Sequence, residues 1–178
     1  IFYLAPLAVF VPSFLIWVTI PFASYLVVRN LELGLFYIVA ISVLSIIGMV
    51  LAGWASGSKY SMLGSARSAA QLISYELPII FVIAGIGILA QSLNLMTIVE
   101  NQVLVPYVIL QPLGFAIFLV AGLAEVGRIP FDIPQAESEV VGGPFVEYTG
   151  MRWAIFFLAE YANTFFIAVL GVLLFLGG

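Results

Sequence analysis

The sequence contains neither cysteine nor histidine. Without thiols or imidazoles the chain can form no disulfide, hold no cysteine-bound iron–sulfur cluster and ligate no haem through histidine, and it lacks the usual ligands of zinc. We therefore expect no metal site in this chain, and any redox centre is expected to lie on another polypeptide.

Charge is equally scarce, at 8% of the 178 residues, and nine acidic residues stand against five basic ones. So few bases cannot form the positive surface that nucleic-acid binding requires. Apolar residues make up 64% of the chain, and the mean hydropathy is +1.24, whereas soluble domains are roughly half apolar. Because a membrane-spanning helix needs about 20 apolar residues, the length allows about five spans.

The apolar stretches predict an all-α polytopic bundle of transmembrane helices. The expected spans cover residues 1–28, 34–55, 69–90, 105–123 and 153–176. Pro6, Pro12 and Pro21 predict a kinked first helix, and small and polar residues from Ser56 to Ser68 predict an interfacial loop. Since the chain opens and closes inside apolar runs and does not begin with methionine, we expect it to be a fragment.

Basic residues are unevenly divided between the connections of these spans. Alternation across the membrane puts four of them on one side, Lys59, Arg67, Arg128 and Arg152, and only Arg29 on the other. Positive residues favour the inner side of a membrane. The long loop 125–152 is therefore predicted to face the cytoplasm or the mitochondrial matrix.

Two acidic residues lie deep within predicted spans. Glu76 follows Arg67 by nine residues, roughly 13 Å along a helix, and Glu160 follows Arg152 by eight, about 12 Å, with Asn163 on the same face. An ionisable group at that depth costs about 2.5–3.5 kcal/mol, so it usually faces a watered cavity or a partner and is a functional candidate. The alternative is a protonated, purely structural side chain bonded to a neighbouring helix.

The loop that begins at Glu125 is rich in acids and in residues that break helices. Its acidic residues are Glu125, Asp132, Glu137, Glu139 and Glu147. The prolines and glycines predict a shaped loop with at most a short helix around Gln135–Val141. A solvated acidic loop is one interpretation. The interleaved apolar side chains, including Ile129, Phe131 and Ile133, favour a loop that folds inward or beneath another protein.

Three runs carry a family resemblance: LAGWASGSKYSMLGSARSAAQLISYELP, LAEVGRIPFDIPQAESEVVGGPFVEY and MRWAIFFLAEYAN. They resemble the heel subunit of respiratory complex I, which is the H subunit of NADH-quinone oxidoreductase. The resemblance covers essentially the whole chain. It implies a single transmembrane domain, residues 1–178, that corresponds to the second to sixth helices of an eight-helix family.

The resemblance also implies a function, which is to form part of the quinone chamber and the acidic path that couples quinone reduction to proton pumping. The residues that match the acidic path are Glu76, Glu125, Glu139, Glu147 and Glu160. Those that match the chamber-side loop are Arg128, Phe131, Asp132 and Glu137. Quinone is the implied substrate, and iron–sulfur clusters and flavin are expected only on partner subunits. The implied partners are peripheral-arm subunits at the quinone site, small membrane-arm subunits and lipid, in a prokaryotic plasma membrane or mitochondrial inner membrane.

Two departures from the family pattern leave alternatives open. Gln135 stands where the family often has Glu, and Pro144-Phe145 replaces a common Phe-Asn, which points to a divergent, for example archaeal, relative and leaves the electron donor open. One alternative function is the related membrane subunit of an energy-converting nickel–iron hydrogenase. Another is an ion channel or antiporter that needs no redox partner.

Overall fold

The structure is a computed structural model that describes residues 1–23, 26–103, 105–133 and 137–178. These residues are predominantly helical, as the sequence predicts. The long helices are α1 (Ala5–Leu15), α2 (Gly34–Ala55), α3 (Lys59–Ala90), α6 (Pro112–Glu125) and α8 (Met151–Gly171). The short helices are α4 (Leu95–Glu100), α5 (Tyr107–Leu110) and α7 (Glu137–Val140), and single helical turns cover Ile16–Thr19, Gly143–Phe145 and Val172–Leu176.

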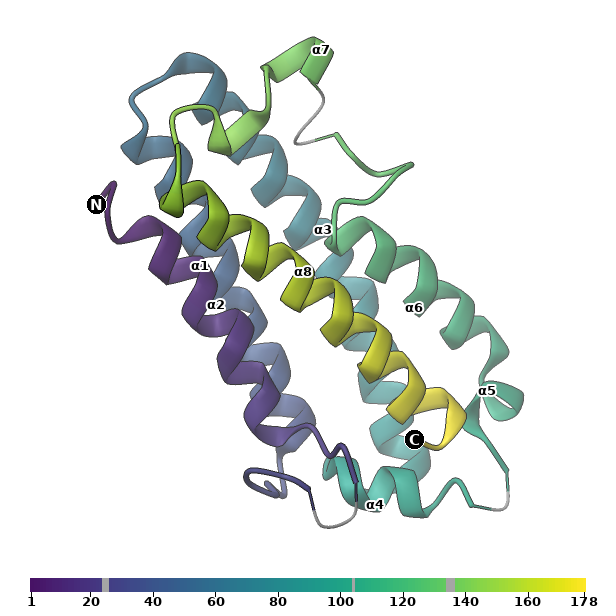
Figure 1. The fold of residues 1–178 in the computed structure, drawn as a ribbon. Coiled ribbons are helices and arrows are strands. Elements are labelled where there is room, and N and C mark those ends of the chain that lie inside the picture. The colour runs from purple at the N-terminus through teal and green to yellow at the C-terminus, as the bar shows by residue number, and fades with distance from the viewer. Residues whose placement is uncertain (24–25, 104, 134–136) are drawn as a thin grey trace.

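The long helices alternate in direction and form one bundle (Figure 1). The α2–α3 turn and the loop that contains α7 lie at one end of the bundle, and the α1–α2 connection, α4 and α5 lie at the other. Arg67 near the start of α3, Arg128 after α6 and Arg152 at the start of α8 therefore share one end, while Arg29 lies toward the opposite end. The alternation of the connections predicted from the sequence is confirmed.

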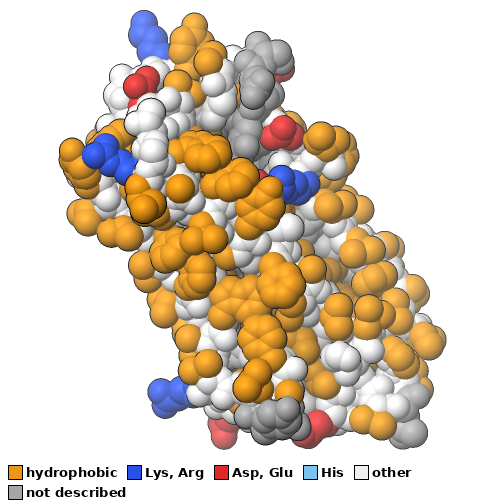
Figure 2. Space-filling model, viewed as in Figure 1, with side chains coloured by type: hydrophobic (Ala, Val, Ile, Leu, Met, Phe, Trp, Pro, Cys, Tyr) orange, Lys and Arg blue, Asp and Glu red, His pale blue; other side chains and the backbone are white. Residues whose placement is uncertain are grey.

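Within the described ranges, three helical stretches are long and apolar enough to cross a membrane. They are Gly34–Ala55, Lys59–Ala90 and Met151–Leu176, with mean hydropathies of 2.6, 2.2 and 1.8. Two shorter apolar stretches, Ala5–Thr19 and Pro112–Glu125, complete the bundle. Figure 2 shows hydrophobic side chains over much of the visible face and charged ones mainly toward its two ends. This distribution fits a bundle surrounded by lipid and other apolar partners.

The predicted interfacial loop from Ser56 to Ser68 is wrong for most of its length, because α3 already begins at Lys59. Its small residues serve helix packing instead. A Cβ on Gly53 would collide with the Ser65 side chain, and one on Gly64 would lie 2.5 Å from Gly143 Cα. Small side chains thus let α2 and the 143–144 backbone approach α3 closely.

The first and fourth spans are shorter than predicted, and proline explains both differences. The first helical stretch ends at Thr19, where Ile20 takes an extended conformation (ψ 120°) before Pro21. A residue that precedes proline is driven out of the helical region. The fourth span begins at Pro112 rather than near residue 105, after the break at Gln111. The short helix predicted around Gln135–Val141 is confirmed as α7.

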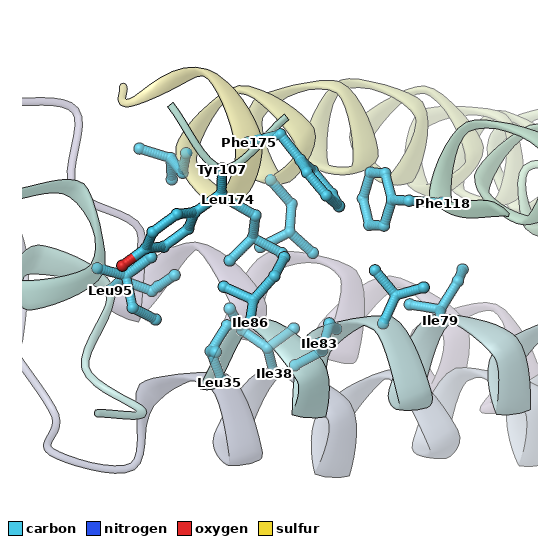
Figure 3. Packing of buried hydrophobic residues seen from close by; sticks show 14 of the residues in the cluster. Leu35, Ile38, Ile79, Ile83, Ile86, Leu95, Tyr107, Phe118, Leu174 and Phe175 are labelled. Carbon is cyan, nitrogen blue, oxygen red and sulfur yellow. The ribbon is translucent and has the colours of Figure 1, made fainter. Parts of the chain in front are cut away.

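Two hydrophobic clusters hold the bundle together. The larger one packs α2, α3, α6 and the turn Val172–Leu176 after α8 through fully buried side chains such as Leu35, Ile86, Phe118 and Phe175, which Figure 3 shows. The smaller one joins the beginnings of α1 and α8 to the end of α2 and to the loop. Its buried members are Ala5, Val9, Ala52, Tyr148, Phe156 and Ala159. The region between the two clusters is where polar side chains gather.

The close approach at Gly64 yields a testable prediction. Gly64→Ala forces a methyl group against the backbone of Gly143 and Pro144, and overpacking of this kind costs about 1–3 kcal/mol. Thermal unfolding of the purified full-length protein in detergent should show a lower Tm for this variant. The control is Ala66→Leu, an exposed position on the same helix, which should leave the Tm near that of the wild type. Equal Tm values for all three proteins would contradict the packing described.

Candidate functional site

A polar cavity of about 90 Å³ lies between the two hydrophobic clusters. Apolar residues of both clusters border it, Val9 and Phe156 from the smaller and Ile16 and Phe166 from the larger. Its polar lining comes from α2, α3, α6 and α8: Ser42, Ser45, Ser68, Gln71, Glu125, Glu160 and Asn163. A water molecule needs about 10–15 Å³ by this measure, so the cavity has room for several.

A second, smaller cavity of about 20 Å³ lies deeper in the bundle. Its polar lining consists of Ser42, Glu76 and Glu125. This volume suits about one water molecule. Glu125, at the last position of α6, lines both cavities, whereas Glu160 lines only the larger one and Glu76 only the smaller one.

Glu76 is buried in α3 and faces a serine on α2. The Ser42 hydroxyl lies 2.7 Å from Glu76 Oε1 and 2.8 Å from the Val39 carbonyl oxygen. A hydroxyl has one proton to donate and lone pairs to accept. Ser42 can therefore donate a hydrogen bond to an ionised Glu76, or donate to the Val39 carbonyl oxygen while it accepts a hydrogen bond from a protonated Glu76. One serine thus serves both protonation states of this acid.

Glu160 on α8 is paired with the arginine that follows α6. Arg128 Nη2 lies 3.3 Å from Glu160 Oε1, and the guanidinium carbon lies 5.0 Å from the centre of the Tyr161 ring. A positive partner offsets part of the cost of a carboxylate placed within an apolar bundle. Arg128 was predicted to belong to the chamber-side loop and Glu160 to the acidic path, and the structure brings the two side chains together.

Phe131 anchors the first part of the loop against α3. Its ring packs edge-on against Tyr75, with 5.4 Å between ring centres, and its carbonyl oxygen accepts a hydrogen bond of 2.8 Å from Gln71 Nε2. Asp132 follows and is partly buried. Of the interleaved apolar residues, Phe131 packs inward, whereas Ile129 and Ile133 are 84% and 54% exposed.

The remaining predicted acids lie apart from the two cavities. Glu139, in α7, forms an ion pair with Arg67 near the end of the bundle. Glu147 is exposed in the loop before α8. The side chain of Glu137, and Gln135 as a whole, lie outside the described residues. The structure therefore gathers Glu76, Glu125 and Glu160 around the cavities and leaves Glu139 and Glu147 on the surface.

The end of the loop is fastened to α2 by a tyrosine. The Tyr148 hydroxyl donates a 3.2 Å hydrogen bond to the Ala52 carbonyl oxygen, and its ring stacks on Phe2 with 4.4 Å between ring centres. Burial raises the pKa of the Tyr148 phenol above its ordinary value, which keeps the hydroxyl protonated and able to donate. The loop is thereby fixed at both of its ends.

Several cavity residues were not predicted from the sequence. The second span was interpreted as an ordinary membrane helix, yet it supplies Ser42 and Ser45, which line the larger cavity from one face. The available signal was their spacing of three residues in an otherwise apolar helix. Ser68 was assigned to the interfacial loop and Gln71 to the third span, and neither was singled out as a site residue. Among the described residues, no group of three acidic side chains is arranged to hold a metal ion.

Comparison with known proteins identifies relatives of the chain. A sequence model of the family described as NADH dehydrogenase matches residues 1–178. The chain is similar to the H subunit of NADH-quinone oxidoreductase from Bacillus cytotoxicus at 50% identity, from Bacillus cereus at 49% and from Geobacillus sp. at 47%. Each alignment covers 100% of this chain and 54% of the relative, so the chain spans about half the length of the curated relatives it matches.

The hydrogen bond between Ser42 and Glu76 predicts a stability difference between two neighbouring serines. Ser42→Ala removes the partner of a buried acid, and a hydrogen bond to a charged group is worth about 1.5–3 kcal/mol. Denaturant unfolding of the full-length protein in micelles should show a loss of this size. Ser45→Ala is the matched control, because its hydroxyl bonds only the Ser42 carbonyl of its own helix, and we expect a clearly smaller loss. Equal losses of unfolding free energy in both variants would show that the hydrogen bond from Ser42 to Glu76 adds no stability beyond that of an ordinary serine in this helix.

Proposed function

The chain belongs to the NADH dehydrogenase family, and we propose that it forms part of the quinone chamber and of the proton path in a proton-translocating NADH-quinone oxidoreductase. The observation that supports the proposal is that Glu125 lines both cavities, of which the larger is also lined by Glu160 and the smaller by Glu76. The family resemblance drawn from the three sequence runs is confirmed. The names of these relatives favour the quinone branch over the hydrogenase alternative.

In this proposal the three acids Glu160, Glu125 and Glu76 carry protons in turn. Water in the larger cavity would join Glu160 to Glu125, and one water in the smaller cavity would join Glu125 to Glu76. A residue that repeatedly takes up and releases a proton needs a hydrogen-bond partner in both protonation states. Ser42 can be that partner for Glu76. Glu139 and Glu147, on the surface of the loop, would belong to the outer part of the same path.

The loop would connect this path to the quinone. Arg128, Phe131, Asp132 and Glu137 are proposed to face the quinone chamber. Arg128 also contacts Glu160, so a movement of the loop during quinone reduction would separate the two side chains and leave Glu160 without its positive partner. Moving one proton against about 180 mV costs roughly 4 kcal/mol. A carboxyl pKa that switches by about three units represents a similar free energy.

Electrons would reach the quinone from a partner subunit. The chain has no cysteine or histidine with which to hold an iron–sulfur cluster, so clusters and flavin are proposed to reside on peripheral-arm subunits. Reduction of a quinone to a quinol takes up two electrons and two protons, and in this proposal the acids of this chain respond to that change of charge. The apolar outer surface suits lipid and the small membrane-arm subunits in a prokaryotic plasma membrane.

The proposal predicts how loss of two acids affects the intact complex in vesicles. Glu76→Gln and Glu125→Gln should each reduce quinone-dependent proton uptake by about tenfold or more, because an amide cannot carry a proton between neighbours. The measurement compares quinone reduction and proton uptake in the same preparation. Glu100→Gln, an exposed acid at the end of α4, is the control and should behave like the wild type. Normal pumping by both buried-acid variants would reduce Glu76 and Glu125 to structural residues.

A further inference from the structure

One side chain holds both ends of the turn that follows α6. Gln71, on α3, donates through Nε2 to the Ala124 carbonyl oxygen at 2.6 Å and to the Phe131 carbonyl oxygen at 2.8 Å. Gln71 is only 8% exposed, so it is held firmly by its surroundings. The two protons of a single amide therefore fix the start and the end of the segment 124–131, which we call the 124–131 turn.

The backbone of this turn closes around Arg128. The Arg128 amide donates to the Leu123 carbonyl oxygen at 3.2 Å, and the Phe131 amide donates to the Arg128 carbonyl oxygen at 2.7 Å. The turn carries Glu125 near its start and Arg128 at its middle, and Arg128 reaches Glu160 on α8. Because the ends of the turn are tied to Gln71, this glutamine determines where both charged side chains stand relative to α3 and α8.

The oxygen atom of the same amide, Oε1, is free to accept a hydrogen bond from a molecule in the cavity. Gln71 Oε1 is buried and has no hydrogen-bond partner among the described residues. The two carbonyl oxygens require the NH₂ group on their side, so the orientation of the amide is determined. Gln71 lines the larger cavity together with Glu125, Glu160 and Asn163. Buried carbonyl oxygens are normally satisfied, and a cavity of about 90 Å³ has room for the water that would do so.

We propose that Gln71 is a positioning residue that joins the 124–131 turn to the acidic cavity. Its amide protons hold the turn so that Arg128 meets Glu160, and its Oε1 accepts a hydrogen bond from cavity water. This inference rests on the proposed function and adds to it a mechanical link. A displacement of the turn moves Arg128 away from Glu160 and, through the same amide, reorients the water between Glu160 and Glu125.

The test uses the intact complex in vesicles and the variant Gln71→Leu, which keeps most of the volume and removes both hydrogen bonds and the acceptor. The number of protons taken up per quinone reduced should fall by about twofold or more in assembled complexes. A merely structural role would lower the amount of active complex and leave this ratio unchanged. Gln111→Leu is the matched control, because Gln111 also has a buried Oε1 without a partner in the described part of the chain and lines neither polar cavity. Its ratio should equal that of the wild type.

A double-mutant cycle tests whether Gln71 acts through the pair of charges. If it does, Gln71→Leu combined with Glu160→Gln should lower the rate of proton uptake by no more than about twofold beyond the stronger single variant. Effects that multiply would show that Gln71 acts independently of Glu160 and would overturn the proposal. An unchanged ratio in Gln71→Leu would overturn it as well.

Assembly and the proposed function are checked separately. If the complex with Gln71→Leu does not assemble, Gln71→Asn replaces it in the test. The shorter side chain of Asn is expected to reach only one of the two carbonyl oxygens. The number of protons taken up per quinone reduced should then be lower than in the wild type. Wild-type behaviour of the Asn variant, or failure of both variants to assemble, would mean that Gln71 acts in folding and would overturn the positioning role. If Glu76→Gln lowers pumping while Gln71→Leu does not, this inference alone fails. If the wild-type complex pumps no protons, the proposed function fails first.

Discussion

Ionisable groups inside an apolar helical bundle need polar partners, and the arrangement of this molecule depends on how those partners are supplied. Glu160 is paired with Arg128, Glu76 with Ser42, and Glu125 borders two small polar cavities. Each partner comes from a different element from the acid that it serves. The helices are therefore tied to one another by the same contacts that stabilise the acids in a low-dielectric interior.

The apolar core is divided into two clusters, and the polar region lies between them. The larger cluster packs the half of the bundle near α4 and α5, and the smaller one fixes the loop end through Tyr148 and Phe156. Between them the helices leave space that water can enter. Close packing on both sides keeps that space small. The loop contributes to this arrangement from the end of the bundle, because it places Arg128 next to Glu160.

Much of the fold was predictable because the hydrophobic pattern is strong. Five apolar stretches, their alternation, the short helix α7 and the depth of Glu76 and Glu160 all follow from the order of residues. Helix ends were predicted less well. The stretch from Lys59 to Ser68 was assigned to a loop since glycine and serine are common there, yet these small residues form the first turns of α3 and let Gly53 and Gly143 approach closely. Small residues indicate a loop in water and a close helix contact in a bundle, and the sequence alone does not distinguish the two.

The sequence by itself determined that this is a helical membrane protein without cysteine or histidine and that rare acids lie within its apolar stretches, because composition and periodicity are local properties. Three characteristic runs also identified its family. Only the tertiary structure decided which acids share a cavity. Glu125 and Glu76 are neighbours in space although 49 positions separate them, Arg128 contacts Glu160, and Gln71 holds the turn that carries Arg128. These relations depend on how helices rotate and pack against one another, and a side chain's distant neighbours are fixed only when the whole bundle has folded.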